Sequence, residues 1–562
     1  MKNKKRFTFG VLASIAIYIS AITATANTTK SIGLKHNLQE TTKVVVPEKE
    51  NKKPNTEVVK EENTTNKSNP LVQEKENKVT QGENTTTQPQ QINPQGSTEN
   101  IAKNSSTATN EPIKKEVVSK YINKGKVSIY NDPQGSKIID TLTKSTRVEI
   151  LKEESVENKK ESKIKKADGT YEIKITAQIN EWAKIKYTKD LKTKEGWVKC
   201  EYLTKDIHKV IPENLSKIDF SPVNKISYPN NPKRNDIKGI YLTVYSAALD
   251  KKLDELIALT KKTGINAFVI DVKDDAGQML FETNAEKKYL GTSKKRYPIA
   301  NIQKLMKKLK DNNIYTIARI VSFKDPRYAQ VNPDKAIIKR ADGKPFTNSD
   351  GVIWVSAHDR NLWEYNVAVA KEAALAGFNE IQFDYVRFPA SNGGKLDKEL
   401  NYRNINGETK PETIQNYLKY ARKELEPYQV YISADVYGQV GSSYDDMALG
   451  QQWEVVSNEV DFICPMAYPS HYGKGVYGLD VPDAHPYKTI YHSTLDGLNR
   501  NNNIQTPANV RPWLQAFTAK WVKGYIPYGH KEIQQQVKAL KDLGINEYLL
   551  WSPSNKYGMV EK

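Results

Sequence analysis

The chain has very few cysteines, only Cys200 and Cys464 in 562 residues, and they lie far apart in the sequence. A protein of this length without cysteine clusters gains its stability from hydrophobic cores and not from a disulfide framework. We expect the two cysteines to lie in different domains, with a disulfide between them as the alternative. Hydrophobic residues are also scarce, at 38%, which predicts that part of the chain does not form a packed core.

Several catalytic signatures are missing as well. The seven histidines are scattered, without an H-E-x-x-H motif or paired Cys/His ligand spacing, which argues against zinc-dependent hydrolysis. The sequence has no G-x-S-x-G nucleophile motif, and no glycine-rich phosphate-binding loop follows the first strand of the C-terminal region. We therefore expect chemistry that requires neither a metal nor a cofactor.

Residues 1–26 have the layout of a secretory signal peptide. A basic head, Met1–Arg6, precedes the apolar run Phe7–Ile22, and Ala24-Thr-Ala26 matches an A-x-A cleavage site. An uncleaved membrane anchor is the alternative. No later stretch is apolar enough to span a bilayer. We expect a secreted, cell-wall-associated protein with no transmembrane segment after signal cleavage.

Residues 27–116 are rich in Thr, Asn, Gln, Lys and Glu and lack aromatic residues. Too little apolar surface is available to offset the entropy lost on ordering such a segment. We predict a disordered linker that holds the following domains away from the membrane.

Residues 117–205 contain short alternating strands separated by turn residues, which predicts a small all-β barrel. Two of its motifs, Glu181-Trp-Ala-Lys-Ile-Lys-Tyr187 and Glu195-Gly-Trp-Val-Lys-Cys200, stand in the order typical of the bacterial SH3-like domain of wall proteins, which the region resembles. The charged stretch 153–171 is interpreted as an insertion between strands. The resemblance implies a domain that binds the cell wall, and a spacer without a ligand is the alternative.

The same region is the most basic part of the exported chain. It has 20 Lys and Arg against 13 Asp and Glu, which gives +7 of the total net charge of +19. Such a charge favours docking to an anionic surface, for example a wall that carries teichoic acid. We expect no nucleic-acid partner, because the chain is exported and the basic stretch has no nucleic-acid-binding motif.

Residues 206–234 form a connector rich in Pro and Asn, and residues 235–562 alternate strands with helices. Eight strands are predicted, at residues 239–243, 267–271, 315–321, 381–384, 430–435, 462–468, 511–517 and 547–551. Helices are predicted between them, at residues 249–263, 301–312, 361–376, 412–426 and 531–543. The fold class is therefore multidomain: a small all-β SH3-like barrel followed by a (β/α)8 TIM barrel, with an open doubly wound sheet as the alternative for the second domain.

In a TIM barrel the side chains at the carboxyl ends of the strands carry out the chemistry. Acids and bases that end predicted strands, or follow them directly, are Asp271, Lys273, Asp274, Arg319, Asp384, Arg387 and Asp435. Three other acids precede their strands and are predicted to form caps or ion pairs at the opposite end: Glu380, Asp461 and Glu547. An ion-pair network that only fastens the strand ends together is the alternative for the first group.

Asp384 and Asp435 end the fourth and fifth predicted strands, which are neighbours. Two carboxyl groups that face one cleft suit the cleavage of a glycosidic bond, because one attacks or activates water while the other protonates the leaving oxygen. Aromatic side chains at the same strand ends are able to stack on a sugar ring: Tyr385, Tyr437, Tyr468, Trp513 and Trp551. We predict that these aromatic groups, together with Asp271, Lys273, Asp274, Arg319 and Arg387, bind the substrate.

Three motifs resemble those of a bacterial family of glycosyl hydrolases whose TIM barrels are distantly similar to α-amylase-like enzymes. They are Ile270-Asp-Val-Lys-Asp-Asp275, Ala318-Arg-Ile-Val-Ser-Phe-Lys-Asp-Pro326 and Phe383-Asp-Tyr-Val-Arg-Phe-Pro389. The resemblance implies that Asp384 is the nucleophile and Asp435 the acid/base of a retaining hydrolase that acts on a cell-wall or extracellular polysaccharide. Asp435 departs from the α-amylase pattern, which has Glu there. A non-catalytic carbohydrate- or wall-binding protein on the same barrel is the alternative.

Overall fold

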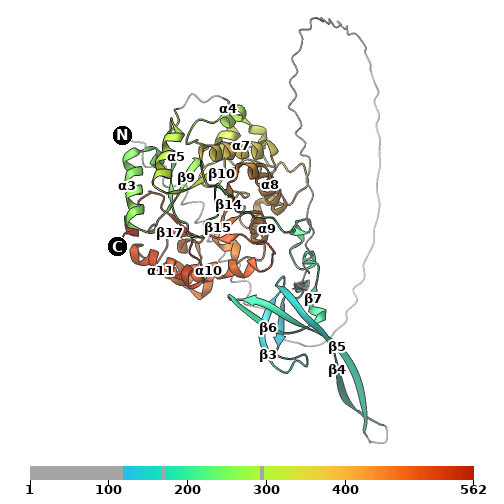
Figure 1. Ribbon diagram of the computed structural model, residues 1–562. Helices are drawn as coiled ribbons and strands as arrows, with labels where there is room; N and C mark the ends of the chain where they lie inside the picture. The colour runs from blue at the N-terminus through green and yellow to red at the C-terminus, as the bar shows by residue number, and fades with distance from the viewer. Residues whose placement is uncertain (1–117, 167–170, 292–295, 562) are drawn as a thin grey trace, which may run out of the picture. The chain divides into compact units, whose positions relative to one another are not determined.

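The computed structural model describes residues 118–166, 171–291 and 296–561. The predicted signal peptide (1–26) and linker (27–116) lie outside the described residues. The described chain forms a small antiparallel β domain followed by a parallel β-barrel surrounded by helices (Figure 1). Within these residues, no helix is both long and apolar enough to cross a bilayer.

The small domain is one antiparallel sheet of seven strands, in the order β3-β2-β6-β5-β4-β1-β7. Its strands are β1 (Ser119–Ile122), β2 (Lys126–Tyr130), β3 (Ile138–Thr143), β4 (Arg147–Lys165), β5 (Tyr171–Lys189), β6 (Lys192–Lys199) and β7 (Leu203–Thr204). Alternate residues such as Val127 and Ile129 enter a small core. The predicted insertion at 153–171 is instead mostly strand, because β4 and β5 continue through it as one long antiparallel ribbon.

The second domain confirms the predicted parallel barrel of eight strands. They are β8 (Lys238–Leu242), β9 (Ala267–Lys273), β10 (Tyr315–Val321), β12 (Glu380–Asp384), β14 (Tyr431–Tyr437), β15 (Phe462–Met466), a seventh strand in two segments, β16 (Asn509–Val510) and β17 (Trp513–Gln515), and β18 (Tyr548–Trp551). β18 pairs with β8 and so closes the barrel. The seventh strand is interrupted at Pro512, which has no N–H to donate to the sheet.

Helices lie between the strands and around the barrel (Figure 1). They are α2 (Val244–Ala248), α3 (Asp250–Lys262), α4 (Asn284–Leu290), α5 (Ile302–Asp311), α6 (Pro326–Val331), α7 (Arg360–Ala376), α8 (Lys410–Leu425), α9 (Trp453–Glu459), α10 (Pro486–Asn501) and α11 (His530–Asp542). Local signals set their ends: Thr409 and Glu412 form a capping box that starts α8. Gly377, at φ 110°, ends α7 in a left-handed conformation and turns the chain into β12.

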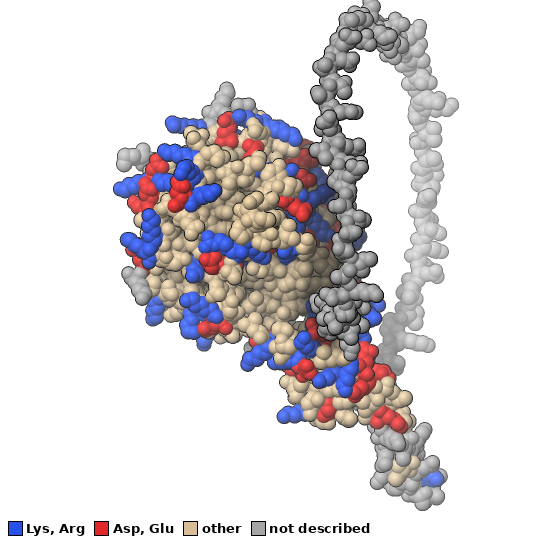
Figure 2. All heavy atoms as spheres, in the orientation of Figure 1, with Lys and Arg blue, Asp and Glu red and all other residues tan. Residues whose placement is uncertain are grey.

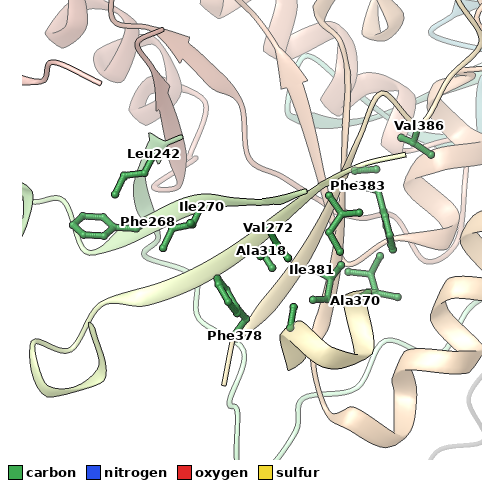
Figure 3. Packing of buried hydrophobic residues seen from close by; sticks show 14 of the residues in the cluster. Leu242, Phe268, Ile270, Val272, Ala318, Ala370, Phe378, Ile381, Phe383 and Val386 are labelled. Atoms are coloured by element: carbon green, nitrogen blue, oxygen red, sulfur yellow. The ribbon is translucent and has the colours of Figure 1, made fainter. Parts of the chain in front are cut away.

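Two hydrophobic layers hold the barrel together. The outer layer lies between strands and helices and includes Phe268, Ile270 and Phe383 (Figure 3). The inner layer fills the barrel and includes Val269 and Ile317. Because successive residues of a strand point to opposite faces, each strand contributes alternately to the two layers. This alternation decides which polar side chains enter the barrel.

The connector seals the end of the barrel where the strands begin. Tyr228 packs into the inner layer, and the Tyr431 hydroxyl donates to the Asn231 carbonyl at 2.7 Å. The Lys225 ammonium group donates to the Ser457 carbonyl at 2.8 Å. With this end closed, a ligand can reach the inside of the barrel only from the carboxyl ends of the strands.

Candidate active site

A cavity of about 120 Å³ opens at the carboxyl ends of the barrel strands. Predicted site residues that line it are Arg319, Asp384, Tyr385, Arg387, Asp435, Tyr437, Tyr468, Trp513 and Trp551. Most of the predicted site residues therefore meet in one hollow, and the two predicted catalytic aspartates are both in its wall.

Asp384 lies at the last position of β12, and its carboxylate is held on both oxygens. The Arg319 guanidinium donates to Oδ2 from Nε at 2.9 Å and from Nη2 at 2.5 Å. The Tyr385 backbone N–H donates to Oδ1 at 2.5 Å. Tyr385 has φ 47°, a left-handed conformation that is rare for a residue with a large side chain and that clusters at functional sites. The carboxylate is thus fixed in one orientation.

Asp435 stands beside Asp384 on the neighbouring strand β14. The parallel register pairs Phe383 with Ala434, so the two aspartates follow at the same level of the sheet. Asp435 is 2% exposed, and Trp513 Nε1 donates to its Oδ1 at 2.7 Å. Burial, and then the negative charge of Asp384, raise the pKa of Asp435 well above its ordinary value, although the Trp513 hydrogen bond opposes this shift.

The two aspartates therefore have opposite environments. Asp384 receives a charged guanidinium, which pairs with an ionised carboxylate. Within the described residues Asp435 receives the neutral indole N–H and forms no ion pair, and its raised pKa favours the protonated form. A carboxyl group with a raised pKa beside a carboxylate that pairs with a guanidinium suits acid–base chemistry on one bond.

Asp271 supports Arg319 from below and does not line the cavity. The Arg319 Nη1 group donates to Asp271 Oδ1 at 2.5 Å, and the Tyr241 hydroxyl donates to Oδ2 at the same distance. Burial raises the pKa of Asp271 to about 6, against the lowering effect of the Arg319 charge. We predicted a substrate contact for Asp271, whereas its contacts in the structure orient Arg319.

Lys273 was also expected at the mouth, but it lies on the other face of the sheet. β9 has a bulge relative to β10: Asp271 pairs with Arg319, and Lys273 pairs with the next residue, Ile320. The bulge breaks the alternation of strand faces. The buried Lys273 ammonium group donates to Asp325 at 2.7 Å and to Asn366 of α7 at 2.6 Å. It therefore fastens α7 to the sheet and is not accessible from the cavity.

Asp274 follows β9 and likewise does not line the cavity. Its Oδ1 accepts the backbone N–H groups of Ala276 and Gln278, at 2.9 and 2.8 Å, and so shapes a tight turn. Burial, followed by the negative charge of Asp271, raises the pKa of Asp274 to about 7. The contacts of this predicted substrate-binding residue are those of a turn residue.

Sequence reasoning missed the part of the cavity wall that loops contribute. These lining residues are Lys324, Asn348, Asp350, Trp354, Gly438, Gln439, His471 and Tyr472, and Met466, at the last position of β15, was missed as well. Lys324 was inside the motif that carried the family resemblance, and its ammonium group pairs with Asp350 at 3.0 Å and with Asp275 at 3.2 Å. Asn348, Asp350 and Trp354 lie in the long loop between β10 and α7, where neither strand alternation nor helical period applies.

A small hydrophobic cluster holds this loop over the strand ends. Ile337, Phe346 and Trp354 pack with Leu400 from the loop that follows β12. Two short antiparallel strands, β11 (Ile338–Lys339) and β13 (Leu400–Asn401), join the two loops. In the part of the chain that the structure describes, no group of three or more His, Cys, Asp or Glu side chains has a geometry that could hold a metal ion.

Comparison with protein families defines the class. Residues 239–557 match the family described as "Putative glycosyl hydrolase domain". Because this match covers more than half of the chain, the protein belongs to that family. A comparison with curated proteins finds no match.

Solved structures with similar chains include proteins from several bacteria. A hypothetical protein from Ruminiclostridium thermocellum ATCC 27405 is 36% identical, with 35% of this chain and 97% of that chain covered and a TM-score of 0.31. The PgaB glycoside hydrolase domain from Bordetella bronchiseptica is 16% identical, with 57% and 94% covered and a TM-score of 0.40. The spore cortex-lytic enzyme SleL from Bacillus megaterium QM B1551 is 11% identical, with 57% and 72% covered and a TM-score of 0.33.

Proposed function

We propose that this protein hydrolyses glycosidic bonds in a cell-wall or extracellular polysaccharide, with Asp384 as nucleophile and Asp435 as acid/base. The observation that carries the proposal is the pair of aspartates at one level of neighbouring strands, one bound to a guanidinium and the other buried with a raised pKa. Neighbouring strands lie about 4.8 Å apart. A retaining hydrolase needs its two carboxyl groups about 5–5.5 Å apart, and we expect retention because the two aspartates stand at one level of neighbouring strands.

In the first step, an Asp384 carboxylate oxygen attacks the anomeric carbon as the bond to the leaving oxygen breaks. Asp435 gives its proton to that oxygen, so the leaving sugar departs as a neutral alcohol and a glycosyl ester forms on Asp384. The ester formation removes the negative charge of Asp384. Because that charge contributes to the raised pKa of Asp435, the same event makes the ionised form of Asp435 easier to keep.

In the second step, the ionised Asp435 removes a proton from a water molecule, whose oxygen attacks the anomeric carbon and displaces Asp384. Asp435 is then protonated again, Asp384 is ionised again, and the sugar is released with its original configuration. Arg319 acts throughout as a positioning residue, because it holds the Asp384 carboxylate and is itself held by Asp271.

A polymeric substrate fits the aromatic residues that lead away from the cavity. Tyr468, in the cavity wall, contacts Phe517 with ring centroids 6.0 Å apart, and Phe517 stacks on Trp521 at 5.9 Å. Trp521 is 39% exposed, although tryptophan is usually well buried. A row of rings that starts at the reaction centre and ends in solvent provides successive faces for sugar rings beyond the bond that is cut.

The proposal includes export and attachment to the cell wall. Its support is the signal-like N-terminus, the basic residues 117–205 and the antiparallel sheet formed by that region. In this proposal the small domain is an SH3-like module that binds the wall and keeps the hydrolase near its polymer.

The test is a screen of the purified protein against wall and capsule glycans, with new reducing ends as the readout. We expect one class of glycan to release reducing ends, and the Asp384→Asn variant to bind that glycan without cleaving it. Nuclear magnetic resonance of the first product reports the anomeric configuration, and retention is expected. Binding of a glycan by the unmodified protein without any turnover would instead identify a carbohydrate-binding protein on a hydrolase-like barrel.

A further inference from the structure

Three cationic side chains line the cavity, and they differ in how they are neutralised. Arg319 is paired with two aspartates, Asp271 and Asp384. Lys324 is paired with Asp275 and Asp350. Arg387 has no ion pair within the part of the chain that the structure describes, although it is only 7% exposed. A buried and unpaired charge is costly, so its retention in a binding cavity calls for a partner.

Arg387 is held rigidly and still has free donors. Its Nη1 group donates to the Phe388 carbonyl at 2.9 Å. Within the described residues, the Arg387 side chain forms no other hydrogen bond. Arginine has five N–H groups in a planar fork, so most of them remain available. The guanidinium lies against three rings, with centroid distances of 4.8 Å to Trp354, 5.2 Å to Tyr385 and 5.2 Å to Tyr437.

This cage of rings has two effects. Cation–π contacts stabilise the positive charge where water is scarce, by roughly 0.5–2 kcal/mol each. The rings also fix the plane of the guanidinium without using its N–H groups. The Arg387 guanidinium is therefore fixed in the cavity wall, three residues beyond Asp384 in the chain, and no carboxylate of the described residues pairs with it.

We infer that Arg387 binds a carboxylate on the substrate, and hence that the polymer contains an acidic sugar, such as a uronic acid or a sugar with a carboxylate-bearing ether. A planar carboxylate matches the guanidinium fork with two parallel hydrogen bonds. One free cation balances one negative charge, which favours a carboxylate over a dianionic phosphate beside Asp384 and Asp350. This inference rests on the proposed function, since it names the substrate class of the same cavity.

The test uses one oligosaccharide in two forms. Uronic-acid oligosaccharides and acidic wall fragments are measured as such and after chemical reduction of their carboxyl groups to alcohols, which removes the charge and keeps the sugar. Calorimetric binding is measured with Asp384→Asn, so that turnover does not interfere. We expect at least one acidic form to bind about 10- to 100-fold more tightly than its reduced form.

Substitution of Arg387 then shows whether this residue recognises the charge. In the Asp384→Asn background, Arg387→Gln should remove the preference for the acidic form and leave the reduced form bound within about twofold. Arg387→Lys keeps the charge but not the fork and should retain part of the preference. Arg234→Gln, at the opposite end of the barrel, is the matched control and should retain all of it.

Several outcomes would overturn the inference. One is equal weakening of both forms by Arg387→Gln, which would make Arg387 a structural cation of the aromatic cage. Another is the absence of any preference for an acidic form in the parent protein. The inference and the proposed function also fail separately. Efficient cleavage of neutral glycans that Arg387→Gln does not change would support the proposed hydrolysis and contradict carboxylate recognition. Charge-dependent binding without turnover would support carboxylate recognition and contradict the proposed hydrolysis.

Discussion

Each end of the barrel holds one arginine between two carboxylates, and the cavity of the candidate site opens at one of these ends. Where the strands begin, Arg511 donates to Glu380 at 2.8 and 2.9 Å and to Glu547 at 3.1 Å. Arg511 and Glu380 are completely buried. This network confirms that acids predicted to precede their strands form ion pairs, and Asp461 likewise pairs with Arg422 at 3.2 Å.

Where the strands end, Arg319 takes the same place between Asp271 and Asp384. The difference lies in what surrounds the triplet. Here a cavity reaches one of the carboxylates, and a third acid, Asp435, stands beside it without a cation of its own. In our proposal, an arginine between two acids has a structural role at the sealed end and belongs to the reaction centre at the end where a cavity reaches one of the acids and a third acid with a raised pKa stands beside it.

Figure 2 shows Lys and Arg side chains interspersed with Asp and Glu side chains over the visible face of the barrel. Interspersed charges of both signs favour solubility and give little steering of a ligand. The visible face of the barrel therefore has no strong field of one sign.

The largest effect is expected from Asp384→Asn at the open end. The amide keeps the shape of the side chain but cannot attack the anomeric carbon, so turnover of a cleaved glycan should fall by about 10³-fold or more. Arg319 keeps its ion pair with Asp271, so the protein should remain folded. Initial rates of reducing-end release measure the loss, and circular dichroism verifies the fold.

Asp311→Asn, at the end of helix α5 on the surface, is the matched control for loss of one carboxylate. Its rate should equal that of the parent protein. Comparable turnover by Asp384→Asn and by the control would mean that Asp384 is not the nucleophile and that the open triplet is a fastening like the sealed one.

The opposite result is expected from Glu380→Gln at the sealed end. This change leaves Arg511 with Glu547 alone in a completely buried site, and breaking a buried ion pair is typically destabilising by about 3–5 kcal/mol. Turnover by the folded protein should change little. Denaturant unfolding measures the free energy; a variant that is as stable as the parent but inactive would reverse the roles assigned to the two ends.

Periodicity predicted the positions of Asp384 and Asp435 because both lie on unbroken strands that follow glycine- or turn-terminated helices. Periodicity placed Lys273 on the wrong face of the sheet, because the bulge in β9 adds one residue and no residue propensity predicts that bulge. The sequence did not show which side chains pair with each other. Arg319 and Arg387 were both predicted to bind the substrate, and the fold shows that Arg319 holds Asp384 while Arg387 lies in an aromatic cage.

The loops explain the rest of the difference. Asp350 and Trp354 reach the cavity because the loop after β10 folds over the strand ends and packs against Leu400. Such contacts join residues distant in sequence and leave no periodic pattern. The long ribbon of β4 and β5 was missed for a related reason: its charged composition resembles that of a loop, whereas antiparallel backbone pairing holds it as strand.

A smaller effect is expected from Trp513→Phe, which tests why Asp435 differs from Asp384. The Trp513 N–H stabilises the ionised form of Asp435 and so lowers its pKa. Without this hydrogen bond the pKa should rise further, because a hydrogen bond to the ionised form favours that form. The alkaline limb of the kcat/KM profile should therefore move to higher pH. A limb that stays in place would mean that Asp435 is not the acid.

The smallest effect concerns Asp274, an acid at the open end but outside the cavity. Its folded-state pKa of about 7 lies above the ordinary 3.8, so its stabilising contribution is complete below about pH 4 and is lost as the pH rises through 7. Asp274→Asn keeps an acceptor for the turn and removes this loss. At pH 8 the variant should gain roughly 1–2 kcal/mol in unfolding free energy over the parent, after allowance for solvent screening of this half-buried group, and at pH 4 the two should agree. Denaturant unfolding at both values measures the difference. An equal effect of Asp274→Asn at pH 4 and pH 8 would show that folding does not raise the pKa of Asp274.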